Sequence, residues 1–321
     1  MKKSSYVYIS ASFAVLYVLL TLYLSQSFDA KSLIHASSFY RENGGGFLNS
    51  TYFALLISGA MPVKEMTLSL NIICTLISAF LIYLILKKAV TKNAALLFSG
   101  MFLSFFIGTC AKTSYVCVAA FLNTFILYVY FMKYSGVVKW YLIEIIIACL
   151  ALHFKIYILF LFLFPLLAFS KIKTYKTSWT AFVNCIGIYA LAFLLYFLFV
   201  KSFPVPLFEF SKQSVKEFVL QFNFEKGLAS AVFLFTLIAN FYCAKLTNTY
   251  ALFGGVSFLT YVLSNCMFKS NISSYYAFFP ICFASFSCVF CHLKIFRGYK
   301  TVSLILCTCF GILMCALQII I

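Results

Sequence analysis

The chain has 321 residues, of which 64% are hydrophobic, 20% aromatic and only 10% charged. A soluble core of this size cannot bury so much apolar surface, so the composition excludes an ordinary soluble domain and predicts an all-α, polytopic integral membrane protein. The formal net charge of +17 comes from lysines and arginines in short segments between apolar runs. Positive charge in such segments sets membrane orientation, which argues against nucleic acid as a partner.

The first apolar run covers residues 6–25 and follows Lys2 and Lys3. About 20 residues is full spanning length, whereas the apolar core of a secretory signal is shorter. Ser25-Gln26-Ser27 offers only a weak small-x-small cleavage site. We therefore interpret this run as the first membrane span, with a cytoplasmic N-terminus.

Ten further apolar runs follow, which gives about 11 transmembrane helices (range 10–12) in a single transmembrane domain over residues 1–321. Alternate threading predicts a C-terminus on the outer, periplasmic face. The inner loops then carry fourteen of the basic residues and no carboxylate, and the outer segments carry ten. The runs after the first are 66–86, 93–110, 113–132, 140–153, 155–170, 178–200, 227–243, 249–268, 272–291 and 301–321.

Two outer segments are longer than connectors, and they contain six of the seven acidic residues. Segment 26–65 includes an apolar stretch at 51–60 that is too short to span a membrane. Segment 201–226 has apolar residues near helical spacing with charged residues between them, which predicts an amphipathic helix on the outer surface. Chemistry is therefore expected on the outer face. The acidic residues are Asp29, Glu42, Glu65, Glu144, Glu209, Glu217 and Glu225, and Glu144 alone falls within a span.

Basic side chains recur at the outer ends of spans: Lys112, His153, Lys155 and Lys269. A single cation at such a turn is explained by snorkelling of its side chain toward water. Cations at several turns at one depth favour a shared basic pocket, for which a phosphate or pyrophosphate is the natural ligand.

The first outer segment also places Asp29, His35, Arg41 and Glu42 on the same side as this pocket. A carboxylate or a histidine facing a sugar hydroxyl can act as a general base or position the acceptor, although each acid can equally be a solvated loop charge. The thirteen cysteines lack metal-ligand spacing and are interpreted as small core hydrophobes. Neither a metal nor a cofactor is expected.

The arrangement resembles the EpsG-like and Wzy-type polysaccharide polymerases of bacterial envelopes. The likeness runs through FDAKSLIHASSFYREN (28–43), GTCAKTSYVCVAAFLNTFILY (108–128), ALHFKIYILFLFLFPL (151–166) and KSNISSYYAFFPI (269–281). Two departures stand out: Lys112 occupies a position where the family commonly has arginine, and Ser273-Ser274 lies where another arginine is frequent. Lysine cannot donate the two parallel hydrogen bonds that arginine makes to a phosphate group. A pyrophosphate site in this chain would therefore rely on the point charges of lysines.

The resemblance implies a GT-C-like membrane glycosyltransferase of the bacterial inner membrane, active in O-antigen, capsule or exopolysaccharide biosynthesis. Such an enzyme transfers a glycan chain from undecaprenyl pyrophosphate to a new lipid-linked repeat unit on the periplasmic face. Its partners would be the undecaprenyl-pyrophosphate-linked oligosaccharide, membrane lipid and a chain-length regulator protein. The roles implied for this chain are pyrophosphate binding by Arg41, Lys112, His153, Lys155 and Lys269, and acceptor activation or orientation by Asp29, His35 or Glu42.

Two other readings of the sequence stay open. A GT-C transferase that adds one sugar from a polyprenyl phosphate donor would need the same outer carboxylate and basic pocket. A lipid-linked glycan transporter, or a scaffold subunit of one, would instead need a continuous polar path through the membrane, and the centres of the predicted spans contain almost no ionisable residue.

Overall fold

The computed structural model describes residues 4–26, 63–111, 116–133, 275–292 and 300–320, together with single helical positions within 187–198 and 227–234. In these ranges the protein is all-helical, as predicted. Two of the helices, over Ser5–Ser25 and Leu68–Leu86, are long and apolar enough to cross a membrane. The helices are α1 (Ser4–Ser25), α4 (Val63–Leu86), α5 (Lys92–Ser104), α6 (Ile107–Ala111), α7 (Val116–Lys133), α14 (Tyr275–His292) and α16 (Lys300–Ile320).

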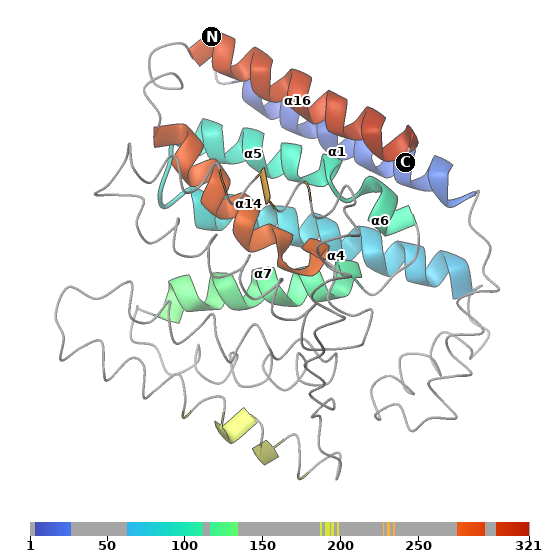
Figure 1. Cartoon of the computed structure of the whole chain (residues 1–321), viewed down its shortest axis with the longest axis vertical. Coiled ribbons are helices and arrows are strands. Elements are labelled where there is room, and N and C mark those ends of the chain that lie inside the picture. Colours follow the sequence, from blue (N-terminus) through green and yellow to red (C-terminus); the bar gives the residue numbers. More distant parts are fainter. Residues whose placement is uncertain are drawn as a thin grey trace, which may run out of the picture.

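The helices run in two opposite directions through one bundle (Figure 1). We call the end where α1 and α16 begin the proximal end, and the end where they finish the distal end. The short turn at residues 87–91 joins the proximal end of α4 to the start of α5. Helix α14 is antiparallel to α5, because Phe279 near its start packs on Phe105 while Phe290 near its end packs on Phe98. Helices α1, α5, α6 and α16 therefore run toward the distal end, and α4, α7 and α14 run away from it.

Most helix boundaries lie within three residues of the predicted runs, but one expectation needs correction below. Helix α4 begins at Val63, so the last residues of the segment predicted over 26–65 are helical and the exposed Glu65 is in the first turn of α4. A carboxylate there is favoured by the partial positive charge of the helix N-terminus.

The run predicted as one span over 93–110 is broken. Helix α5 ends at Ser104 and α6 begins at Ile107, so α5 alone is about 20 Å long and too short to cross a bilayer. At the break, the amides of Phe105 and Phe106 donate to carbonyls only three residues earlier, which tightens the last turn of α5. The start of α5 is capped conventionally, with the Thr91 hydroxyl accepting from the Ala94 amide at 3.4 Å.

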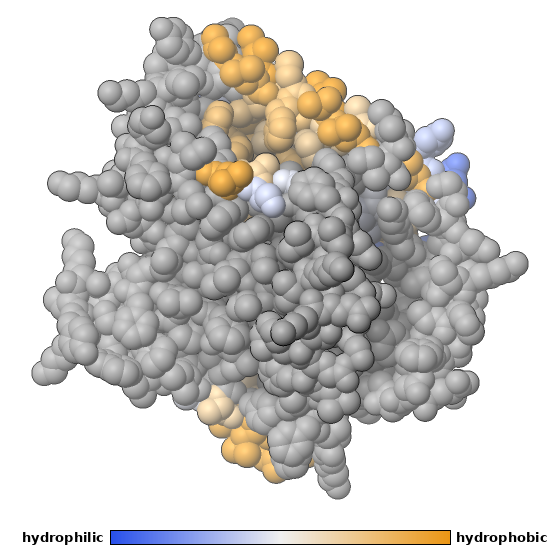
Figure 2. All heavy atoms as spheres, viewed as in Figure 1, coloured by the Kyte–Doolittle hydropathy of each residue, from blue (hydrophilic) through white to orange (hydrophobic). Residues whose placement is uncertain are grey.

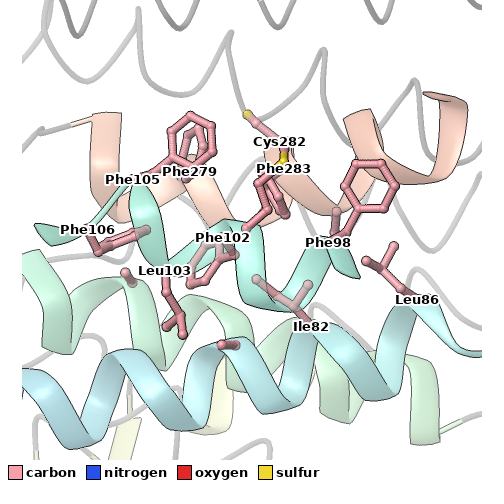
Figure 3. Close-up of a cluster of buried hydrophobic side chains, with 14 of the residues drawn as sticks. Ile82, Leu86, Phe98, Phe102, Leu103, Phe105, Phe106, Phe279, Cys282 and Phe283 are labelled. Atoms are coloured by element: carbon pink, nitrogen blue, oxygen red, sulfur yellow. The ribbon is translucent and has the colours of Figure 1, made fainter. Parts of the chain in front are cut away.

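A cluster of buried aromatic side chains fills the space between α5, α6 and α14, which we call the aromatic cluster (Figure 3). Phe102 is at its centre, with ring-centroid distances of 4.8 Å to Phe106, 5.5 Å to Phe283 and 6.1 Å to Phe279. Phe105 adds contacts of 4.8 Å to Phe279 and 5.6 Å to Phe283. Such tilted and edge-on pairs each contribute about 0.5–1.5 kcal/mol beyond the burial of their area, so the cluster holds α14 firmly on α5.

Small residues let neighbouring helices approach closely on the other side of α5. A Cβ atom added at Gly100 of α5 would lie 2.9 Å from the Cα atom of Ser10 in α1. A Cβ added at Gly311 of α16 would lie 2.5 Å from the ring of Phe13 in α1. Glycine is thus required where α1 crosses α5 and where Phe13 packs on α16, a pattern common among helices that pack inside membranes.

Apolar side chains also gather on the outer edge of the bundle where α16 and α1 lie (Figure 2). Along α1 the outward positions include Val15 and Leu19, which are 58% and 60% exposed. Helix α16 shows a similar face through Leu306 and Leu313. This belt of exposed aliphatic residues matches the surface that a helix presents to lipid.

Candidate functional site

The residues that the sequence predicts to do chemistry lie outside the described part of the chain. This holds for all of the following: Asp29, His35, Arg41, Glu42, Lys112, His153, Lys155 and Lys269. What the structure does describe is the set of helix ends to which several of these residues are joined, and the interior of the bundle beside those ends.

Charged residues in the described ranges are segregated between the two ends of the bundle. Lys64 and Glu65 belong to the first turn of α4 at the distal end. The other charged residues lie at the proximal end, namely Lys87, Lys88, Lys92, Lys133 and Lys300. Lys87 also stacks its ammonium 6.0 Å from the ring of Tyr83. The proximal end thus carries lysines without carboxylates among the described residues, the charge pattern that the predicted threading assigns to the cytoplasmic face.

The buried face of α1 changes from apolar to polar along its length. Phe13, Tyr17, Thr21 and Ser25 follow one another at four-residue spacing and are 5%, 0%, 0% and 5% exposed. Residues at this spacing share one face of a helix. The polar part of the stripe therefore lies in the distal half of α1 and faces the interior of the bundle.

Helix α4 repeats this pattern in the opposite direction. Its buried stripe starts with Leu68, continues with Asn71, Thr75 and Ser78, which are 0%, 2% and 1% exposed, and ends nearer the proximal end with Ile82 and Ile85. Because α4 runs antiparallel to α1, the polar residues near the middle of α4 lie beside the polar part of the α1 stripe, with Thr75 next to Tyr17. We call the residues Tyr17, Thr21, Asn71 and Thr75 the polar stripe.

Tyr17 connects the two helices at the inner edge of the polar stripe. Its hydroxyl lies beside the hydroxyl of Thr75 in α4 and the thiol of Cys110 in α6, without a hydrogen bond of good geometry to either. Cys117, in the first turn of α7, lies beside Cys110 and Thr75 in turn. Four helices therefore meet at this point, next to the ends of α6 and α7 that flank residues 112–115.

Many serine and threonine hydroxyls of the described helices donate a hydrogen bond to the preceding turn of their own helix. The Thr75 hydroxyl donates to the Asn71 carbonyl at 2.8 Å and the Ser78 hydroxyl donates to the Cys74 carbonyl at 2.7 Å. The same bond to the preceding turn is made by Ser12, Ser25, Ser99, Ser104, Thr124, Ser287 and Thr308. Such bonds are the usual way for a serine or threonine to sit within an apolar helix.

Thr21 and Asn71 break this rule. The Thr21 hydroxyl does not bond to its own helix and has no hydrogen-bond partner among the described residues. The amide oxygen and nitrogen of the Asn71 side chain are also unpartnered there, although both residues are fully buried. An unpaired polar group in an apolar interior costs about 1–3 kcal/mol, so these atoms are the chemically unusual part of the described bundle.

Most cysteines in the described ranges are buried, which agrees with their interpretation as small core hydrophobes. Eight of them are buried and only Cys309 is exposed, and Cys307 and Cys309 diverge on α16 as their two-residue spacing requires. Within the described residues no group of three histidine, cysteine or acidic side chains is arranged to hold a metal ion. These thiols pack as small hydrophobic side chains in the core.

The polar stripe was not among the residues predicted from sequence. The predicted site residues are ionisable and lie at span ends or in an outer segment, whereas the polar stripe consists of uncharged residues inside spans. Its signal is the recurrence of polar residues every three or four positions within two apolar runs, over 17–25 and 71–78.

No protein-family model, no curated protein and no solved structure matches the chain.

Proposed function

We propose that the protein is an integral membrane polysaccharide polymerase, which extends a glycan carried on undecaprenyl pyrophosphate at the outer face of the bacterial inner membrane. The observation that carries the proposal is the common distal end of α1, α6 and α14. Three of the proposed site residues are joined to these helix ends by short pieces of chain.

The covalent chain limits how far these residues can be from the distal end. Lys112 directly follows Ala111, the last residue of α6, and Asp29 follows Gln26 by three residues. Three residues of chain span at most about 11 Å. Lys269 precedes Tyr275, the first residue of α14, by six residues or at most about 22 Å of chain. In the sequence, a carboxylate and two lysines of the proposed site are thus within six residues of helix ends that share one end of the bundle.

The directions of the helices support the predicted eleven-span topology. Helix α7 finishes at the proximal end and α14 begins at the distal end. If both cross a membrane, the chain between them must cross it an odd number of times. The sequence contains five apolar runs in this interval, at 140–153, 155–170, 178–200, 227–243 and 249–268.

The position of the polar stripe favours a transferase over a transporter. A transporter needs a polar path from one face to the other. Among the described helices, the buried stripes of α1 and α4 become apolar toward the proximal end, at Phe13 and at Ile82 and Ile85. The buried faces of α1 and α4 therefore do not provide a polar path to the proximal end, which suits a reaction at the outer face better than transport.

The proposed reaction is a displacement at the anomeric carbon of the growing chain. A hydroxyl oxygen of the incoming repeat unit forms the new bond to this carbon, and its proton passes to a carboxylate or histidine, for which Asp29, His35 and Glu42 are the candidates. The bond from the same carbon to the pyrophosphate oxygen breaks, and its electron pair leaves with the lipid pyrophosphate. Lys112, Lys155, Lys269, His153 and Arg41 would stabilise the charge that develops on this leaving group.

The proposal is tested with a double variant, Lys112→Ala with Lys155→Ala. We expect long glycan chains to disappear while the protein remains in the membrane, because the leaving group loses two charges that stabilise it. The matched control is Lys87→Ala with Lys88→Ala, which removes two exposed lysines from the opposite end of the bundle. Glycans of normal length in the Lys112/Lys155 variant would refute the pyrophosphate site.

Deletion of the gene separates the three readings of the sequence. Gel analysis of the surface glycan should show a single repeat unit on its lipid carrier or core if the protein is a polymerase. A full ladder with one sugar missing would instead identify a transferase that adds a side branch, and loss of all surface glycan would favour export.

A further inference from the structure

We propose that Tyr17, Thr21 and Asn71 form a binding site, buried in the distal half of the bundle, for the hydroxyl group of a small uncharged molecule. The inference rests on the described helices α1 and α4 and does not depend on the polymerase reaction.

The three side chains lie at neighbouring levels of two antiparallel helices. Tyr17 reaches from α1 to Thr75 of α4. Thr21 is one turn further toward the distal end on α1, and Asn71 is one turn further in the same direction on α4. One turn rises about 5.4 Å along the axis of each helix. Thr21 and Asn71 are therefore at one level of the bundle, one turn beyond the Tyr17–Thr75 pair.

The lengths of these side chains explain why they do not satisfy one another. A tyrosine is long enough to bring its hydroxyl across the separation between α1 and α4, beside Thr75. Threonine and asparagine are several bonds shorter, and neither Thr21 Oγ1 nor the Asn71 amide has a hydrogen-bond partner among the described residues. A molecule with one hydroxyl could join them.

The chemistry of the site selects an uncharged ligand. The Asn71 amide supplies two donors and an acceptor, and the hydroxyls of Tyr17 and Thr21 each supply a donor and an acceptor. No charged side chain belongs to this part of α1, α4 or α6 in the described ranges. A hydroxyl, which both donates and accepts, fits this set, and it could belong to water or to a sugar.

The missing hydrogen bond of the Thr21 hydroxyl is an independent indication that this hydroxyl binds a ligand. Thr75, Thr124 and Thr308 donate to the preceding turn of their own helices at 2.6–2.8 Å. Thr21 forgoes this bond although its burial is complete. A threonine in an apolar helix gains from such a bond unless its hydroxyl is needed elsewhere.

The test is radiolytic labelling of the full chain in detergent with ¹⁸O-enriched water, read by mass spectrometry at single residues. A hydroxyl radical formed from a bound water reacts with the aromatic ring next to it. We expect label on Tyr17 despite its complete burial and none above background on the equally buried Phe98 and Phe102. Loss of one hydrogen bond lowers occupancy about tenfold, so Thr21→Val and Asn71→Leu should each reduce labelling of Tyr17 by about that factor.

A matched variant and a second measurement keep the test decisive. Thr308→Val makes the same chemical change at a self-bonded hydroxyl on α16 and should leave the labelling of Tyr17 unchanged. Thr21→Val should lower the Tm by about 2 °C if its hydroxyl binds a ligand. A higher Tm would show that the wild-type hydroxyl was merely unsatisfied, and this result would overturn the proposal.

The remaining outcomes are equally informative. Labelling of Tyr17 at the background of Phe98, or undiminished labelling in both Thr21→Val and Asn71→Leu, would also overturn the site. Addition of an undecaprenyl-pyrophosphate-linked oligosaccharide then distinguishes the two sources of the hydroxyl. Weaker labelling of Tyr17 identifies a sugar that displaces the water, and unchanged labelling identifies water as the ligand.

Discussion

The aromatic cluster and the polar stripe lie in the same bundle and are equally buried, yet their interactions differ. Phe102 is surrounded by the ring of Phe106, in the break between α5 and α6, and by two rings of α14, with centroids 4.8–6.1 Å away. Thr21 and Asn71 are just as inaccessible, but their polar atoms lack hydrogen-bond partners in the described structure. The first region is explained by packing alone, and the second is not.

This difference indicates where stability and function reside. Dispersion and ring contacts hold α5, α6 and α14 together whatever the protein does. A buried polar group without a partner reduces stability, and its retention points to a role beyond folding.

Removal of the central ring should cause the largest loss of stability. Phe102→Ala deletes the side chain that contacts Phe106, Phe279 and Phe283. We expect the free energy of unfolding in detergent to fall by about 3–5 kcal/mol, because a cavity replaces the ring. The control Leu306→Ala, at a position 54% exposed, should cost much less. Equal losses in the two variants would mean that the cluster does not form the core.

A charge on the outside of the bundle tests whether that surface faces lipid. Val15 lies near the middle of α1 and is 58% exposed. In a membrane, Val15→Lys should raise the apparent free energy of insertion of α1 by about 2.5–3.5 kcal/mol, measured in a translocon insertion assay. The control Val15→Leu should insert as well as the wild type. If the lysine were tolerated without cost, the exposed face would be in contact with water.

The close crossing of α1 and α5 should respond to a single methyl group. Gly100→Ala places a Cβ 2.9 Å from the backbone of Ser10, so α1 must move. We expect a loss of about 1–3 kcal/mol in the free energy of unfolding. Gly187→Ala is the control, since no atom lies within 4 Å of the added carbon. A Gly100→Ala variant as stable as the control would show that the helices are further apart.

Removal of a hydroxyl that donates to its own helix should change the free energy of unfolding least. Ser78 is buried on the same stripe as Asn71, but its hydroxyl donates to the Cys74 carbonyl of its own helix. Ser78→Ala should therefore change the free energy of unfolding by about 0.6 kcal/mol. Ser12→Ala, which removes a similar bond at an exposed position, should behave alike. A loss above about 2 kcal/mol would require a partner for Ser78 outside its own helix.

The sequence predicts much of the described fold because apolar run length is a strong signal in this chain. The runs 6–25 and 66–86 agree with α1 and α4 to within three residues. The break between α5 and α6 was not predicted, since neither proline nor glycine occurs at Phe105 and Phe106. Hydropathy averaged over a run does not register a helix that ends through local hydrogen bonding.

The candidate site could be predicted only in part. Charge patterns in the sequence predict that its acids and lysines lie on one face, and these residues are outside the described part of the chain. The polar stripe depends on which helix faces pair, and a single sequence does not reveal this. Tyr17 and Thr75 are far apart in the chain, and only the packing of α1 and α4 around α6 brings them together.

The most direct test of the proposed function uses the purified full chain in lipid vesicles that contain one lipid-linked repeat unit. On incubation, the repeat units should be converted into a ladder of longer glycans on undecaprenyl pyrophosphate, with release of free undecaprenyl pyrophosphate. The Lys112→Ala, Lys155→Ala double variant should leave the single unit unchanged. A wild-type protein that leaves the repeat unit unextended, or adds only one sugar from a polyprenyl phosphate donor, would contradict the account.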